Sequence, residues 1–144
     1  MNKLDGITLE ILWSNLIATV TEQAHALQRI AFSPIVREAG DLATALFDRE
    51  GRMVAQAVTG TPGHINSLGA AGRHFVQAFP PETLAPGDVL ITNDPWLSAG
   101  HFFDITVMTP VFRGTRCIGF FGSTIHHTDI GGYGVGAGAR DVHE

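Results

Sequence analysis

The chain begins with an apolar stripe that only a long helix can present on one face. Its members recur at intervals of three and four residues, the spacing of one side of an α-helix; they are Leu9, Leu12, Trp13, Leu16, Ile17, Val20, Ala24, Leu27 and Ile30. Thr8 is the predicted N-cap, because its hydroxyl can accept a bond from an unpaired amide of the first turn. Ser33-Pro34 ends the pattern, because the residue before a proline avoids helical geometry. We therefore predict one helix over residues 8–32, whose apolar face docks on the rest of the fold.

The apolar pattern changes after Asp41 from helical spacing to short runs bounded by turn residues, which is typical of β-strands. The predicted strands cover residues 42–47, 52–56, 89–92, 105–112 and 116–125, and a second helix covers residues 67–79. Turns at 48–51 and 113–115 join neighbouring strands into hairpins. The expected fold class is α+β, with the long N-terminal helix packed on a mixed or antiparallel sheet.

The chain is short for the elements that it carries. With 144 residues, 44% of them hydrophobic, it has room for one core. It ends soon after a glycine-rich segment, 131–138, without an element that would cover both faces of the last hairpin. Residues 1–144 are therefore expected to be the N-terminal portion of a domain, that is, a fragment of a larger α/β subunit.

Composition excludes several classes of function. The formal net charge is −5 and the nine Lys and Arg residues are spread thinly, so no basic stripe exists for nucleic acid. The single cysteine, Cys117, excludes a disulfide framework and a Cys-rich zinc module. No apolar run predicts a signal peptide or a membrane span, which makes the cytoplasm the expected location.

The glycine-rich segment does not predict a nucleotide site. A phosphate-binding loop needs a strand before it and a helix N-terminus after it. Residues 139–144 indicate no helix, and the chain contains no Gly-Lys-Ser or Gly-Lys-Thr. We expect no ATP binding by this segment.

Histidine and aspartate side chains gather in the last third of the chain. They lie in the segment 93–104 and in His126-His127-Thr128-Asp129. Imidazole and carboxylate are ligand types that suit zinc, manganese or iron, provided that three or four of them converge. The predicted hairpin of residues 105–125 can bring these side chains together.

The predicted hairpin brings an acid and an imidazole to its open end. A three-residue loop at 113–115 places Asp104 opposite Thr124 and His126 opposite Phe102, on one side of the sheet. His101 precedes the strand and can turn toward the same point. The residues alone leave two interpretations open, a metal site and a set of structural polar side chains.

Neighbouring histidines have different expected roles. His126 and His127 point to opposite faces of a strand, so both cannot bind one ion without a bulge. His127 is the candidate for proton transfer, and Asp129 is placed to orient its ring. His74 is expected on a helix surface, whereas His64 can either line a site or hold a turn.

Several distinctive segments run in order over almost the whole chain: Thr8-Leu9-Glu10-Ile11-Leu12, Ala31-Phe32-Ser33-Pro34, 41–48, Gly51-Arg52-Met53-Val54-Ala55-Gln56, Pro86-Gly87-Asp88-Val89, Asn93-Asp94-Pro95, 100–105 and 126–132. Together these segments resemble the N-terminal region of the hydantoinase B/oxoprolinase family. Family members are several times longer, which agrees with the expected fragment. One loop differs, because many members carry Gly-Gly-Thr-His where this chain has Ser98-Ala99-Gly100-His101.

The resemblance implies one subunit of an ATP-dependent cyclic-amide hydrolase that acts on hydantoins or 5-oxoproline. It implies a divalent metal held by Asp41, His101, Asp104 and His126, and Asp41 is a ligand that spacing alone does not locate. It also implies a hydantoinase A-like partner subunit, in which ATP phosphorylates the lactam or ketone oxygen or bicarbonate. His127 remains the expected proton-transfer group.

Two other functions stay open at this level. Acetone and acetophenone carboxylases use a similar subunit, so ketone carboxylation is the alternative enzymatic function. The third possibility is an inactive fragment or an interaction module whose histidines and aspartates are structural. The sequence does not select among these functions, nor does it select one metal or one oligomeric state.

Overall fold

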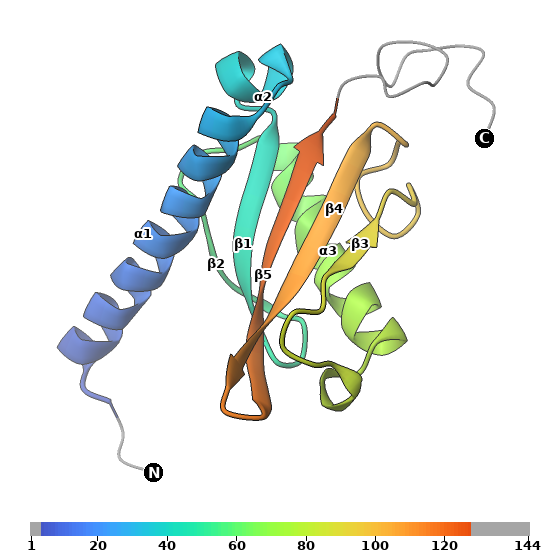
Figure 1. Cartoon of the computed structure of the whole chain (residues 1–144). Helices are drawn as coiled ribbons and strands as arrows, with labels where there is room; N and C mark the ends of the chain where they lie inside the picture. The colour runs from blue at the N-terminus through green and yellow to red at the C-terminus, as the bar shows by residue number, and fades with distance from the viewer. Residues whose placement is uncertain (1–3, 128–144) are drawn as a thin grey trace.

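The computed structural model describes residues 4–127, which form an α+β fold with helices on both faces of a five-stranded sheet (Figure 1). The helices are α1 (Gly6–Ile30), α2 (Pro34–Ala39), α3 (Pro62–Ala78) and the short 3-10 helix η1 (Pro81–Thr83). The strands are β1 (Leu42–Asp48), β2 (Met53–Gln56), β3 (Leu90–Thr92), β4 (Asp104–Arg113) and β5 (Arg116–His126). The predicted fold class and strands are confirmed. The glycine-rich segment 131–138 and Asp129 lie outside the described residues.

The sheet has the order β2-β1-β5-β4-β3, and each neighbouring pair is antiparallel. β5 therefore lies in the centre, between β1 and β4. Successive side chains of a strand point to opposite faces. On β1, Ala43, Ala45 and Phe47 face the core beneath α3, whereas Leu42 belongs to the core beneath α1 and α2.

Each face of the sheet has its own hydrophobic core. The core beneath α3 consists of Ala43, Ala45, Phe47, Leu68, Ala71, Phe75, Leu90, Met108, Cys117 and Phe120. The core beneath α1 and α2 consists of Val20, Ala24, Val36, Leu42, Ala55 and Ala57. The buried Thr44 hydroxyl ties α1 to β1, because it donates to the Val20 carbonyl at 2.8 Å. One face of the last hairpin is thus covered by α3, contrary to the expectation that both would lack a cover.

The N-terminus of α1 differs from the prediction. Asp5, not Thr8, is the N-cap: its carboxylate accepts both the amide and the hydroxyl of Thr8 at 2.8 Å. A carboxylate also interacts favourably with the positive end of the helix dipole. The hydrogen bond from the Thr8 amide lowers the pKa of Asp5. At the other end α1 stops at Ile30, because Ala31 is already extended.

Only the second half of α1 docks on the sheet. Val20 and Ala24 are buried, whereas the first half of the predicted stripe is exposed at Leu9, Leu12, Trp13 and Leu16. The helix crosses the sheet at an angle and diverges from it toward the N-terminus (Figure 1). The prediction that the whole stripe docks is therefore wrong for these residues. Within residues 4–127, none of the helices is long and apolar enough to cross a membrane.

The helix α3 begins five residues earlier than predicted, at Pro62 instead of residue 67. Proline suits the first position of a helix, because its missing N–H would have no intrahelical partner there. Pro62-Gly63 therefore starts a helix and does not form a separate turn. As a result His64 lies in the first turn of α3 and is buried.

The turn between β4 and β5 is one residue shorter than predicted. Arg113 pairs with Arg116, and Gly114 adopts a φ of 63°, which suits a two-residue hairpin turn. A β-bulge between Val111 and Phe112 shifts the pairing once more. At Asp104 the register therefore differs from the prediction by two residues, one from the turn and one from the bulge.

The new register places Asp104 directly opposite His126. The predicted pairings of Asp104 with Thr124 and of His126 with Phe102 are therefore wrong. Because the total shift beyond the bulge is even, Asp104 and His126 keep their predicted face of the sheet. The acid and the imidazole are consequently closer than the prediction required.

Gly72 marks the closest approach of α3 to the sheet. A Cβ at this position would lie 2.6 Å from Phe47 Cε1 and 2.7 Å from the Gly51 carbonyl oxygen. We expect Gly72→Ala to lower the free energy of unfolding by about 1–3 kcal/mol, because the added methyl group overpacks this contact. Gly63→Ala on the same helix is the control, since its Cβ would meet nothing within 4 Å. Denaturant unfolding compares the variants, and equal stabilities would contradict the assignment.

Candidate metal centre

Three neighbouring strand ends supply acidic and imidazole side chains to one point. Asp41 precedes β1, Asp104 begins β4 and His126 ends β5, which lies between the other two strands. Asp104 pairs with His126, and the His126 amide donates to the Asp41 carbonyl at 3.3 Å. The alternation of side chains places all three on the α3-facing side of the sheet.

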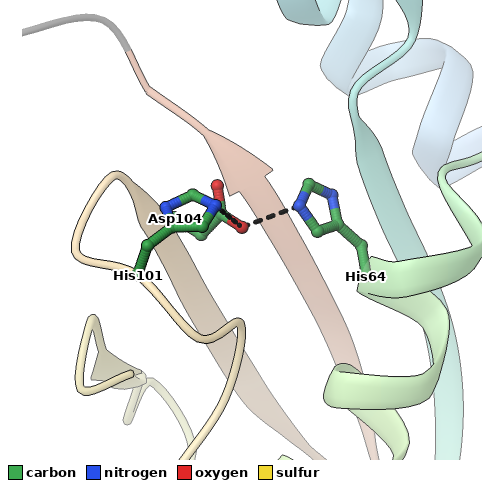
Figure 2. Close-up of side chains that lie close together, drawn as sticks. All are labelled: His64, His101 and Asp104. Carbon is green, nitrogen blue, oxygen red and sulfur yellow. Dashed lines mark ion pairs between the residues drawn. The ribbon is translucent and has the colours of Figure 1, made fainter. Parts of the chain in front are cut away.

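Asp104 is the centre of this cluster, and its side chain is completely buried. Its Oδ1 is hydrogen-bonded to Nδ1 of His126 at 2.9 Å. Its Oδ2 lies 2.7 Å from Nε2 of His64 and 3.3 Å from Nε2 of His101 (Figure 2). One buried carboxylate is therefore surrounded by three imidazoles.

His101 reaches Asp104 from the loop between β3 and β4 (Figure 2). This loop is fixed to the sheet at two points. The hydroxyl of Ser98 is hydrogen-bonded to that of the buried Thr106. The buried ring of Phe103 stacks on His126, with centroids 6.0 Å apart. These contacts fix the loop in a position from which His101 turns toward Asp104, as the sequence predicts.

His64 enters the site from the helix layer and contacts both acids. Its Nδ1 lies 3.4 Å from Oδ1 of Asp41, while its Nε2 faces Asp104. Thr61 occupies the N-cap position of α3 but makes no side-chain cap; its hydroxyl donates instead to Oδ1 of Asp41 at 2.7 Å. The Thr61 hydroxyl therefore does not cap the helix but orients Asp41 instead.

Opposing effects of burial and charge act within the cluster. Burial raises the pKa of Asp104, but the contacts with His64, His101 and His126 together lower that pKa below its usual value. The contact with Asp104 raises the pKa of His64, although burial acts in the opposite direction. Both directions reflect a stabilising interaction between the buried acid and its imidazole neighbours.

Several buried polar atoms of the cluster make no hydrogen bond of regular geometry to a described residue, although two of them, Oδ2 of Asp104 and Nδ1 of His64, lie in the ion-pair contacts given above. They are Nδ1 of His64, Nδ1 of His101 and Oδ2 of Asp104. A buried polar atom without a partner costs free energy, so native structures usually pair it with another group. A cation close to Oδ2 of Asp104 would interact with this oxygen in addition to the nitrogens of His64 and His101.

The donor set fits a divalent metal. Ligand atoms of His64, His101 and Asp104 all lie within 4.8 Å of one another. Asp41 and His126 extend this group, with 4.0 Å between Oδ2 of Asp41 and Nδ1 of His126. Two carboxylates balance the charge of a divalent ion, and imidazole with carboxylate suits zinc, manganese or iron. Of the four ligand candidates from the sequence, His101 and Asp104 belong to this group together with His64, and Asp41 and His126 lie beside it.

His127 lies next to this cluster, one residue beyond β5. Its amide donates to the Phe103 carbonyl at 2.9 Å, and its ring centroid lies 6.0 Å from that of Phe103. Phe103 thus contacts both His126 and His127. His74 is exposed on α3, as predicted.

His64 is the site residue that sequence reasoning leaves undecided. Pro62-Gly63 is compatible with a turn, and the predicted helix begins after it. Apolar residues at 65, 68, 71 and 75 extend the helical spacing back toward residue 62. Together with a proline suited to the first helical position, this spacing is the signal that identifies the longer helix.

Comparison with known proteins identifies the family. The family model described as hydantoinase B/oxoprolinase matches residues 5–144, so the chain belongs to this family. The B-type subunit of a putative D-/L-hydantoinase from a Pseudomonas species is 32% identical over 133 residues, which are 91% of this chain and 22% of that protein. The chain spans about a quarter or less of the length of such curated relatives.

Solved structures show the same fold in larger proteins. The nucleotide-free structure of acetone carboxylase matches 87% of this chain and 16% of its own chain, with a TM-score of 0.74 and 29% identity. An ATP-dependent caprolactamase from Pseudomonas jessenii matches 91% of this chain and 22% of its own, with a TM-score of 0.74 and 30% identity. Both are similar to this chain over nearly all of its described elements.

The raised pKa of His64 predicts how the stability of the metal-free chain depends on pH. A group with a raised pKa in the folded state contributes stability that is complete below its unfolded value, here 6.5, and is lost as pH rises through the folded value. In the presence of a chelator, the thermal midpoint of the wild type should therefore fall relative to His64→Gln as pH increases above that value. His74→Gln, an exposed change on the same helix, should keep the wild-type dependence. Parallel curves for the wild type and His64→Gln would contradict this prediction.

Proposed function

We propose that this member of the hydantoinase B/oxoprolinase family is the metal-binding catalytic part of an ATP-dependent cyclic amidase that hydrolyses hydantoins or 5-oxoproline. The observation that carries the proposal is the buried Asp104 with imidazole nitrogens on both of its oxygens. A buried carboxylate with several imidazoles is the ligand chemistry of zinc, manganese and iron sites. The similarity to a hydantoinase and to a caprolactamase supports the amide substrate.

The proposed ligands are Asp41, His101, Asp104 and His126. They come from three strand ends and one anchored loop, so the fold sets their mutual positions before a ligand binds. Asp104 contributes a buried negative charge, and Asp41 adds a second, partly exposed charge, with 28% of its side chain accessible. Substrate would approach the ion from this partly exposed side.

The metal would supply Lewis-acid chemistry toward the carbon that ATP-dependent phosphorylation has activated. The residues of this chain would orient that carbon for attack by water, the second reactant of the hydrolysis. His127 would move a proton to the leaving nitrogen as the ring opens, since it lies beside the cluster and imidazole exchanges protons near neutral pH. Its position against Phe103 supports a role distinct from that of His126.

ATP would be handled by a partner, a hydantoinase A-like subunit, in the cytoplasm. The hydantoinase relative is named as one subunit of its enzyme, and both similar structures are ATP-dependent enzymes. This chain contributes no Gly-Lys-Ser or Gly-Lys-Thr sequence. In this proposal the partner subunit phosphorylates the substrate, and the activated substrate then reacts at the metal centre of this chain.

Ketone carboxylation is the second candidate function. The acetone carboxylase structure has the same TM-score, 0.74, as the caprolactamase structure. The fold similarity therefore supports both reaction types equally. Product analysis with the partner subunit, ATP and either a cyclic amide or a ketone with bicarbonate distinguishes them.

Metal content tests the proposed centre. We expect the purified chain to bind one equivalent of a divalent metal, and His101→Ala and His126→Ala to weaken binding by more than the roughly 10- to 100-fold typical of losing an outer-shell partner. Elemental analysis and metal competition measure this change. His74→Ala, at an exposed position, should bind metal like the wild type. No stoichiometric metal in the wild type would instead favour the structural interpretation of the cluster.

Turnover tests the role of His127. Reconstituted with the partner subunit and ATP, His127→Gln should reduce kcat by about 10²- to 10⁴-fold, the range of a general acid or base. Metal content should remain that of the wild type, because His127 is not one of the proposed ligands. A variant with normal kcat, or one that has lost its metal, would show that the proton-transfer role is wrong.

A further inference from the structure

We propose that His64 is a positioning residue that clamps Asp41 and Asp104 from the helix layer; this inference rests on the proposed metal centre. The two acids belong to different strands, with β5 between them. Each needs a fixed direction if both are to face one ion. A group above the sheet that contacts both acids can provide that constraint.

The contacts of His64 divide between the two acids. Its Nδ1 lies 3.4 Å from Oδ1 of Asp41, and its Nε2 lies 2.7 Å from Oδ2 of Asp104. A ligand imidazole points one nitrogen at its ion, whereas His64 has one nitrogen beside each carboxylate. Carboxylates that bind a metal are themselves held by outer partners, and His64 is placed to act as such a partner for both acids.

The start of α3 is built to hold this ring in place. Pro62 fixes the backbone at the first helical position, two residues before His64. The Thr61 amide donates to the Leu42 carbonyl at 3.0 Å, and the Thr61 hydroxyl donates to Oδ1 of Asp41 at 2.7 Å. Thr61 and His64 thus contact the same oxygen of Asp41 from one turn of α3.

The nearby histidine His101 behaves differently and supplies a comparison. Among residues 4–127, only the Nε2 atom of His101 faces an acid, at 3.3 Å from Oδ2 of Asp104. His101 therefore has the single-nitrogen approach expected of a ligand, while His64 spans two acids. The two residues should respond differently when the same metal is bound.

Cobalt substitution distinguishes a clamp from a ligand. We would titrate Co²⁺ into the wild type, His64→Ala, His64→Gln and His101→Ala, and record affinity and the visible spectrum at saturation. For a clamp, His64→Ala should lower affinity about 10- to 100-fold while its saturated spectrum matches the wild type. His64→Gln should recover part of that affinity, because its amide nitrogen can reach the place of Nε2. His101→Ala should change the saturated spectrum or abolish binding.

Two results of the cobalt titration would overturn the clamp. A saturated His64→Ala spectrum with shifted bands would make His64 a ligand, and unchanged affinity would give it no role at the metal. The unfolding of the metal-free chain is a separate readout: His64→Ala should lower the thermal midpoint more than His74→Ala, because Asp104 would lose a partner while buried. If the wild type binds no cobalt, the proposed function fails, and equal midpoints for these two variants would then reject the clamp as well.

Discussion

A carboxylate without solvent contact at the start of β4 is the constraint on which the site depends. Asp104 is completely buried, and an isolated charge in that position would be strongly unfavourable. His126, His64 and His101 approach its two oxygens from a strand, a helix and a loop. The sheet, the helix layer and the β3–β4 loop therefore meet at a single charged group, and the geometry of each is tied to the others.

The strand pattern of the sequence is sufficient to place Asp104 and His126 together, although the predicted pairing is wrong in detail. The two-residue turn depends on Gly114, and the bulge at Val111 and Phe112 depends on local packing that alternation does not encode. Between the bulge and the metal site, two single-residue errors add to an even shift, which leaves Asp104 and His126 on their predicted face of the sheet. Face assignment is thus more predictable than register, because it depends only on parity.

The strand pattern does not place two other residues of the site, Asp41 and His64. Asp41 is brought to the cluster by the non-local pairing of β1 with β5, and only family resemblance indicates it. His64 depends on where α3 begins, and Pro62-Gly63 is compatible with either a turn or a helix start. Asp41 thus depends on a tertiary contact. For His64, the apolar spacing of residues 65, 68, 71 and 75 favours the helix start, but it does not indicate the contacts with the two acids.

The partial docking of α1 has a consequence for local unfolding. Its C-terminal half is anchored by Val20 and Ala24, while about three turns before them contribute exposed apolar side chains such as Leu12 and Trp13. Free energies of local opening follow such differences in buried contact. In the chain alone, amide protons near Val20 should exchange with deuterium slowly, whereas those of the first turns should exchange early and offer sites for limited proteolysis.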